Sequence, residues 1–199
     1  MHPTAPKSNR ATPSENRAKP RLLLHACCAP CSTAVVERLA LDYAISIYFF
    51  NPNIYPVAEY LQRRDELLHW CNKVAGIPCL EGEYAPEEWM EQVRGLELEP
   101  ERGRRCNRCF RLRLQRTAIY AREHGYDLFT TVLSISPHKR HERINRLGLA
   151  LAARCGIEFY SANFKKQNGF KRSIEISTAQ NFYRQNYCGC VFSRPTADA

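Results

Sequence analysis

The sequence lacks the apolar segments that direct a protein to or through a membrane. Residues 1–20 are polar and rich in proline and serine, without the apolar stretch that forms the centre of a signal peptide. No run of about 18 apolar residues occurs in the 199-residue chain, so the sequence predicts no membrane span. We therefore expect a cytoplasmic protein that has no membrane partner.

The sequence also lacks the glycine-rich loops that bind nucleotide phosphates. Neither GxGxxG nor GxxxxGK[ST] occurs, although these patterns place backbone N–H groups around a phosphate at the start of a helix. The SGGxDS motif, which ATP pyrophosphatases of similar layout carry after their first strand, is also missing. These absences argue against a reaction that consumes ATP.

What is present is enough apolar sequence for a core and an excess of positive charge. Hydrophobic residues make up 44% of the chain, which is typical of a globular protein. The net charge of +9 favours a polyanionic partner, with nucleic acid first. We expect a disordered basic tail at 1–20, a single catalytic α/β domain with a cysteine-rich metal site at 21–194, and a flexible C-terminus at 195–199.

Apolar runs and helical periodicities alternate about five times within the expected domain. Strands are expected at 21–26, 43–50, 77–80, 127–135 and 157–162. Helices are expected at 57–75, 86–93, 106–123, 141–155 and 173–182, and a first helix should begin with Ser32 as its N-cap. This alternation predicts an α/β fold with a doubly wound, mostly parallel sheet. In such sheets, ligands bind outside the carboxyl ends of the strands.

Ten cysteines need an explanation in a chain of this length. Without a signal peptide, clustered cysteines indicate metal binding or catalysis more often than structural disulfides. We interpret the isolated Cys71, Cys79 and Cys155 as small core residues. The other seven form three clusters, which are Cys27/Cys28/Cys31, Cys106/Cys109 and Cys188/Cys190.

The first two clusters together predict a metal site. Cys27 and Cys28 follow the first strand, whereas Cys106 and Cys109 begin a helix, whose N-terminus helps to hold them as thiolates. Four thiolates can bind either zinc or a [4Fe–4S] cluster. Because structural zinc sites usually combine two Cys-x-x-Cys pairs, the adjacent Cys27-Cys28 pair favours the cluster. Cys31 is a fifth ligand, a ligand to a second metal ion or a resolving thiol.

The third cluster, Cys188-Gly189-Cys190, can close only a small, strained disulfide ring that is easily reduced. It therefore suits a redox relay, and a role as two further metal ligands is the alternative. His138 follows a strand end beside Ser134 and Ser136. We expect it to act as a general acid or phosphate contact, or to serve only in a turn.

Positive charge is concentrated between Arg102 and Arg116, where seven arginines and no acidic residue occur. A solvated helix face normally mixes charges of both signs, so this segment favours contact with nucleic acid. Tyr187 could stack on a base of a single-stranded RNA loop. The candidates for RNA binding are Arg104, Arg105, Arg108, Arg111, Lys139, Lys171, Arg172 and Tyr187.

The chain resembles the epoxyqueuosine reductases of the QueH type from residue 21 to about 194. The resemblance rests on six segments in order: LLLHACCAPC (22–31), FFNPNIYPVAEYLQR (49–63), RCNRCFRLRL (105–114), FTTVLSISPHK (129–139), FKKQNGFKRSIE (164–175) and YRQNYCGC (183–190). It implies an adenine-nucleotide α-hydrolase-like, Rossmann-like sandwich and the last step of queuosine synthesis. In that step, the epoxide of epoxyqueuosine at the wobble position of tRNAs with GUN anticodons is reduced, and its oxygen leaves as water. These are the tRNAs for Tyr, His, Asp and Asn.

The resemblance also implies roles for individual cysteines. Some members have Asp at the position of Cys31, where it is implicated in binding an additional iron, so Cys31 is a candidate ligand to a mononuclear iron. An electron donor is implied without being identified. Two other functions remain: a zinc-dependent RNA-binding module without turnover, and a metal-free thiol–disulfide oxidoreductase. The family's cluster ligands match Cys27, Cys28, Cys106 and Cys109, and its redox-active pair matches Cys188 and Cys190.

Overall fold

The computed structural model of the chain describes residues 18–194. The expected C-terminus at 195–199 and all but residues 18–20 of the expected tail at 1–20 lie outside the described residues. The predicted domain at 21–194 is therefore almost the whole of what the structure describes. Among the described helices, none combines the length and the apolar character needed to cross a bilayer.

A five-stranded sheet forms the centre of the molecule. Its strands are β1 (Arg21–Ala26), β2 (Ala44–Phe49), β3 (Cys79–Glu81), β4 (Leu128–Thr131) and β5 (Glu158–Phe159). They are parallel throughout and lie in the order β3-β2-β1-β4-β5. Leu24 of β1 pairs with Ile47 of β2 on one side and with Thr130 of β4 on the other. The predicted doubly wound α/β fold is confirmed.

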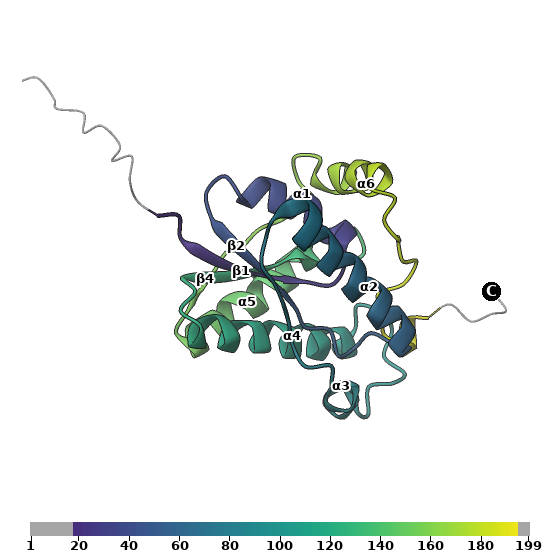
Figure 1. The fold of residues 1–199 in the computed structure, drawn as a ribbon. Coiled ribbons are helices and arrows are strands. Elements are labelled where there is room, and N and C mark those ends of the chain that lie inside the picture. The colour runs from purple at the N-terminus through teal and green to yellow at the C-terminus, as the bar shows by residue number, and fades with distance from the viewer. Residues whose placement is uncertain (1–17, 195–199) are drawn as a thin grey trace, which may run out of the picture.

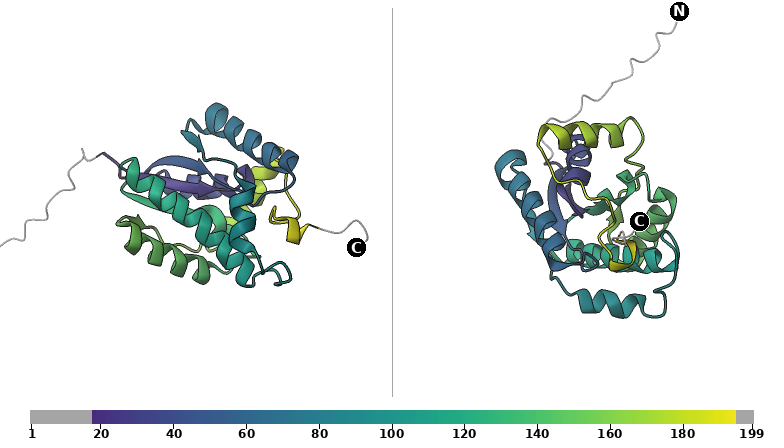
Figure 2. Two further views of the ribbon diagram at one scale, coloured as in Figure 1. Left: turned by 90° about the horizontal axis from the view of Figure 1, so that it is seen from below. Right: turned by 90° about the vertical axis from the view of Figure 1, so that its right-hand side faces the viewer.

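Helices cover both faces of this sheet (Figures 1 and 2). On one face lie α1 (Ala29–Leu39), α2 (Val57–Trp70) and α6 (Gly169–Ala179), and α6 packs against α1. On the other lie α4 (Arg104–Glu123) and α5 (His141–Cys155), with the short α3 (Pro86–Val93) against α4. This arrangement follows from right-handed crossovers, because the chain moves outward from β1 in one direction and later in the other.

The central strand is apolar because both its faces are covered. Leu22, Leu23 and Leu24 are all fully buried, as expected for consecutive residues of a parallel strand between two helical layers. Cys71 is buried in this core, and Cys79 and Cys155 are half-buried against it. The interpretation of these three cysteines as core residues is confirmed.

The expected start of the first helix is wrong by four residues, because its N-cap is Cys28 rather than Ser32. Helix α1 begins at Ala29, after Cys28 in extended conformation (φ −176°), and Pro30 lies in its first turn. A proline at this place suits a helix start, since its fixed φ is already helical and its missing N–H would have had no partner. Ser32 lies inside the helix, where its hydroxyl donates to the Cys28 carbonyl at 2.8 Å.

Later boundaries also differ from the expectation, and the strand expected at 157–162 is only Glu158–Phe159. The apolar run at 127–135 is a strand only to Thr131, whose hydroxyl accepts from Leu133 N as the chain turns into a 3₁₀ helix at Val132–Ile135. Helix α6 begins at Gly169 rather than at residue 173. A Cβ on Gly169 would lie 1.9 Å from the Phe164 carbonyl oxygen, so only glycine permits this turn.

The strand order creates a crevice at the carboxyl ends of β1 and β4. These strands are neighbours, but the chain leaves β1 toward β2 and leaves β4 toward β5. The connections therefore diverge, which is where open α/β sheets bind ligands. Cys27 and Cys28 follow β1, and His138 follows the 3₁₀ helix after β4. Both sequence motifs thus flank the same crevice.

Candidate metal and redox site

The first turn of α1 gathers three thiols. The sulfur atoms of Cys27, Cys28 and Cys31 all lie within 4.8 Å of one another, and those of Cys27 and Cys28 are 3.8 Å apart. Residues three apart on a helix share a face, which brings Cys31 back over the extended Cys28. Gln185 donates from Nε2 to the Cys28 sulfur at 3.2 Å. Thiolates in such a group can hold a metal ion.

A cavity of about 330 Å³ opens beside this group. Thiols from both ends of the chain, Cys27, Cys31 and Cys188, line it. Its size lies in the range of small-molecule sites. Its charged lining is mainly cationic, with Arg63, Arg113, Lys139 and Arg184 against the single carboxylate of Glu101, and His138 also lines it.

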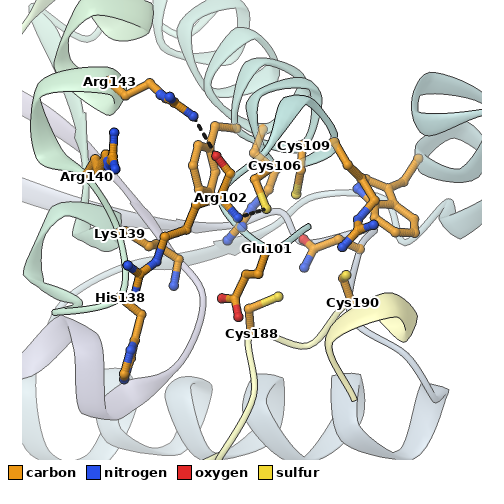
Figure 3. A pocket seen from close by; sticks show the side chains of 15 residues that line it. Glu101, Arg102, Cys106, Cys109, His138, Lys139, Arg140, Arg143, Cys188 and Cys190 are labelled. Atoms are coloured by element: carbon orange, nitrogen blue, oxygen red, sulfur yellow. Dashed lines mark hydrogen bonds between the residues drawn. The ribbon is translucent and has the colours of Figure 1, made fainter. Parts of the chain in front are cut away.

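A second, narrower cavity of about 40 Å³ adjoins the first. Figure 3 shows the thiols of Cys106 and Cys109, from the start of α4, in the same space as those of Cys188 and Cys190. Cys106 accepts a hydrogen bond from the Arg102 backbone at 3.2 Å. Lining residues common to both cavities are Glu101, Arg113, His138, Lys139 and Cys188. The structure thus brings the three cysteine clusters to two adjoining cavities, while a single four-cysteine ligand set stays a prediction.

Three residues that line the narrower cavity have a buried polar atom without a hydrogen-bond partner among residues 18–194. These atoms are Trp89 Nε1, Asn53 Oδ1 and Arg105 Nε, on side chains that are 2–3% exposed. Buried polar atoms normally have partners. An indole N–H beside thiol sulfurs can donate a hydrogen bond to an anionic sulfur centre. An asparagine side-chain amide can do the same if it is flipped so that its NH₂ group takes the place of the oxygen. The donor set of this cavity therefore fits an iron–sulfur group.

The two thiols near the C-terminus differ in acidity. The Cys190 thiol donates toward Cys188, and this contact, helped by Lys139 and Ser193, lowers the pKa of Cys188 to about 5 against the effect of burial. Ser193 lies 2.9 Å from the Cys188 sulfur. The same contact raises the pKa of Cys190 well above its usual value, and burial adds to the effect. The pair thus consists of one thiolate and one protonated thiol at neutral pH.

A similar division occurs in the first cluster. Thiol hydrogen bonds from Cys28 and Cys31 lower the pKa of Cys27 well below its usual value, and Arg113 and Lys139 act in the same direction. The pKa of Cys28 rises to about 12, chiefly through its contact with Cys27. In the second cluster, burial raises the pKa of Cys109. Loading a metal must therefore displace protons from several of these thiols.

Arg113, which lines both cavities, is buried and has two neutral hydrogen-bond partners. Its side chain is 3% exposed, and it donates to Asn51 Oδ1 at 2.5 Å and to His25 Nε2 at 3.3 Å. Burial, together with the charge of Arg113, lowers the pKa of His25 to about 3, so this imidazole is neutral. Its Nδ1 lies 2.8 Å from the Thr131 hydroxyl, and its Nε2 also lies 3.2 Å from the Phe50 carbonyl oxygen.

The predicted RNA contacts fall into two groups. Arg104, Arg108 and Arg111 are exposed and recur at i, i+4 and i+7 on the outer face of α4. Lys171 is exposed on α6, and Lys139 lines both cavities. His138 is exposed at the mouth of both cavities, and its backbone N–H donates to the Ser136 hydroxyl.

The other three predicted contacts are engaged within the fold. Arg105 is 3% exposed and donates to three backbone carbonyls, including that of Glu97 at 2.7 Å. This corrects the expectation for Arg105, whose guanidinium is a structural contact rather than an exposed phosphate ligand. Arg172 pairs with Glu37 of α1 at 2.8 Å. Tyr187 donates to the Tyr55 carbonyl at 2.7 Å, although its ring still lines the larger cavity.

The sequence analysis did not single out Arg63, Arg113 or Gln185. A signal for Arg63 exists, because the buried residues of α2 are Tyr60, Arg63, Leu67 and Trp70. Their spacing is that of an apolar helical stripe, in which an arginine is out of place. An arginine at a core position indicates a buried anionic partner nearby.

Comparison with known proteins identifies the family of this chain. The family model described as epoxyqueuosine reductase QueH matches residues 22–196. The epoxyqueuosine reductase QueH of Acinetobacter baylyi is 45% identical over 177 residues, which cover 87% of this chain and 80% of that protein. Its counterpart in Thermotoga maritima is 36% identical over 178 residues, covering 86% of this chain and 89% of that protein. The chain therefore belongs to the epoxyqueuosine reductase QueH family.

Proposed function

We propose that this protein reduces epoxyqueuosine in tRNA to queuosine, the final step of queuosine synthesis. Conversion of an epoxide to an alkene takes up two electrons and two protons and releases the oxygen as water. The observation that carries the proposal is the larger cavity, which thiols from both ends of the chain and several cationic groups line together. Such a site can bring a source of electrons to an RNA-borne substrate.

We assign a [4Fe–4S] cluster to Cys27, Cys28, Cys106 and Cys109, and an additional iron to Cys31. Support comes from the close group of thiols after β1, the thiols at the start of α4, and the buried Trp89 N–H beside Cys109, which has no hydrogen-bond partner among residues 18–194. When bound, such a cluster passes single electrons, and an exposed iron polarises an oxygen ligand. The positive charge of Arg113 offsets the charge of the thiolates.

Cys188 and Cys190 serve as the two-electron reservoir in this proposal. Closing their disulfide from one thiolate and one thiol releases the two electrons that the epoxide consumes and one of its two protons, so the second proton comes from another donor or from solvent. Cys190 retains its proton at neutral pH because its pKa is raised. His138 lies at the mouth of the same cavities and is a second candidate donor to the departing oxygen. An external electron donor then reduces the disulfide.

The partner in this proposal is the anticodon loop of the tRNAs for Tyr, His, Asp and Asn, which places the reaction in the cytoplasm. The exposed arginines of α4 and Lys171 of α6 would bind its phosphates, which position the RNA without reading its sequence. The wobble nucleoside would leave the stack to enter the larger cavity. Tyr187, which lines that cavity, is the candidate for stacking on the base.

The test is turnover of an anticodon stem–loop that carries epoxyqueuosine. The protein is purified without oxygen, assayed for iron and acid-labile sulfide, and mixed with the stem–loop and a reductant. Nucleosides are then identified by mass spectrometry. We expect about four irons or more per chain and formation of queuosine, which Cys188→Ser or Cys190→Ser abolishes.

Cys155→Ser is the matched control, because Cys155 ends α5 and lines neither cavity. It should leave turnover unchanged. A colourless, zinc-loaded protein without turnover would refute the reductase and favour an RNA-binding module. Turnover that survives Cys106→Ser would instead favour a metal-free thiol–disulfide oxidoreductase.

A further inference from the structure

The segment that carries Cys188 and Cys190 has no helix or strand of its own. It follows α6, which ends at Ala179, and precedes a 3₁₀ turn at Val191–Ser193. Its position therefore depends on contacts with other elements. These contacts come mainly from α2 and from the loop before it, which lie on the same side of the molecule as the C-terminal segment (Figure 2).

Arg63 of α2 makes the central contacts. Its side chain is 1% exposed, and it donates to the Tyr187 carbonyl at 3.3 Å and to the Cys188 carbonyl at 3.4 Å. Its Nε donates to Glu59 at 2.6 Å, and its guanidinium lies 5.3 Å from the centre of the Tyr187 ring. The planar guanidinium thus joins a carboxylate of α2 to the segment at 180–190 that carries Cys188 and Cys190, which we call the redox segment.

Further contacts hold the segment on both sides of this point. Glu59 also accepts from the Tyr183 hydroxyl at 2.9 Å, and Glu66 accepts from the Tyr183 backbone at 2.7 Å. At the other end, Tyr55 donates its backbone N–H to the Gly189 carbonyl at 2.8 Å. The backbone around Cys188 is therefore bonded at each side.

Gly189, between the two cysteines, is fitted to this arrangement. Its φ of +103° lies in a region that side chains disfavour. A Cβ there would lie 2.9 Å from Ile54 Cγ1 and 3.2 Å from Arg63 Nη1. The redox segment thus approaches Arg63 as closely as a glycine permits.

We infer that Arg63 is a positioning residue that fixes Cys188 and Cys190 side by side at the mouth of the adjoining cavities. This inference rests on the proposed function for its role in turnover. A lysine could not replace Arg63, because its single ammonium group cannot reach two carbonyls and Glu59 in the planar geometry that the guanidinium supplies. Arg63 acts through the backbone of the pair and touches neither sulfur.

The first test uses the metal-free protein without RNA. Arg63→Lys is equilibrated in thiol–disulfide buffers, and the oxidised fraction of the Cys188–Cys190 peptide is measured by alkylation and mass spectrometry. We expect the effective concentration of one thiol for the other to fall at least tenfold, which makes the disulfide easier to reduce by about 30 mV. Arg64→Lys on the same helix, where Arg64 pairs with Asp65, is the control and should show no shift.

The second test separates positioning from substrate binding, because Arg63 also lines the larger cavity. In the loaded enzyme, Arg63→Lys should lower kcat for the stem–loop about tenfold and leave KM within twofold. An unchanged dithiol equilibrium overturns the inference, whatever the kinetics. A raised KM with that equilibrium unchanged assigns Arg63 to RNA binding instead.

If Arg63→Lys fails to fold, Gly189→Ala disturbs the same contact without altering a buried charge, and the same shift is expected. The dithiol measurement needs no turnover. A protein without reductase activity would therefore refute the proposed function alone, and the dithiol equilibrium would still decide the role of Arg63.

Discussion

Replacing Arg113 by methionine should affect the metal-free and the cluster-loaded protein differently. Arg113 is 3% exposed, and its side-chain partners among residues 18–194 are the neutral groups of Asn51 and His25. A buried cation without a carboxylate costs free energy that only an anion can recover. Its charge favours the thiolate forms of Cys27 and Cys109, which belong to the proposed ligand set. We therefore expect the loaded site to be its counter-charge.

The expected free energies follow from these contacts. Arg113→Met removes two hydrogen bonds from a charged donor, at ~1.5–3 kcal/mol each. It also removes the free-energy cost of burying the guanidinium charge, which is on the order of several kcal/mol. These opposing terms leave the unfolding free energy of the metal-free protein within about 2 kcal/mol of wild type. In the loaded protein, attraction between Arg113 and the anionic site would contribute a further ~1–4 kcal/mol, the range for a close pair of unit charges between bulk water and an effective dielectric constant near 20.

The measurement is urea unfolding without oxygen, followed by circular dichroism for the metal-free protein and by loss of absorbance near 400 nm for the loaded one. The loaded form of Arg113→Met should lose its cluster at a clearly lower urea concentration, whereas the metal-free form should unfold near the wild-type midpoint. Arg116→Met is the control, because Arg116 lies on the same helix but is exposed and pairs with Glu88. Equal destabilisation of both forms would show that Arg113 is an ordinary structural residue and refute the reasoning.

Three further outcomes are expected. The rate at which iodoacetamide alkylates Cys188 in the metal-free protein should rise with pH through an inflection near pH 5. In Cys190→Ala the inflection should move toward the ordinary thiol value, because the hydrogen bond that Cys190 donates is lost. An unmoved inflection would contradict this cause. Gly148→Ala should destabilise the protein by ~1–3 kcal/mol in urea unfolding, because the added Cβ would lie 2.4 Å from the Phe159 ring; a wild-type midpoint would show that the ring can move away. Arg108→Ala should weaken RNA binding and reduce the slope of log K against log salt by about 0.7–0.9, whereas Arg154→Ala at the far end of α5 should not; equal slopes for both variants would place the RNA elsewhere.

The sequence was sufficient for the fold because its periodicities reflect local burial. The run at 43–50 is apolar at successive positions, as a strand covered on both faces requires, and it forms β2. The sequence was less reliable for the ends of helices and strands, because several neighbouring residues can start or end an element equally well. Ser32 satisfies the preference for an N-cap, yet Pro30 lets the helix begin earlier. The apolar run at 127–135 likewise does not reveal that the backbone turns at Thr131.

The cysteines of the site were also predictable, because their spacing is a chemical signal in itself. The adjacent pair after the first strand lies at the crevice that the strand order creates, and Cys31 follows one helical turn later. Arg105 and Arg108 could not be distinguished in this way. Both lie in one basic segment, but the first is buried against backbone carbonyls and the second is exposed. Arg105 is buried because the loop after α3 folds back onto the start of α4, where the carbonyl groups of Leu96, Glu97 and Glu99 accept from its guanidinium.

Three arginines are buried around the site, and the partners of their guanidinium groups differ. Arg63 has the carboxylate of Glu59, and Arg105 has three carbonyl oxygens and the face of the Phe192 ring. Arg113 has one amide oxygen and one imidazole nitrogen among the described residues. Burial of a cation is least compensated there, at the two cavities that the cysteines line. Arg113 already lowers the pKa of the Cys27 and Cys109 thiols, and further ionised thiolates with a bound cluster would supply more of the negative charge that this buried cation needs.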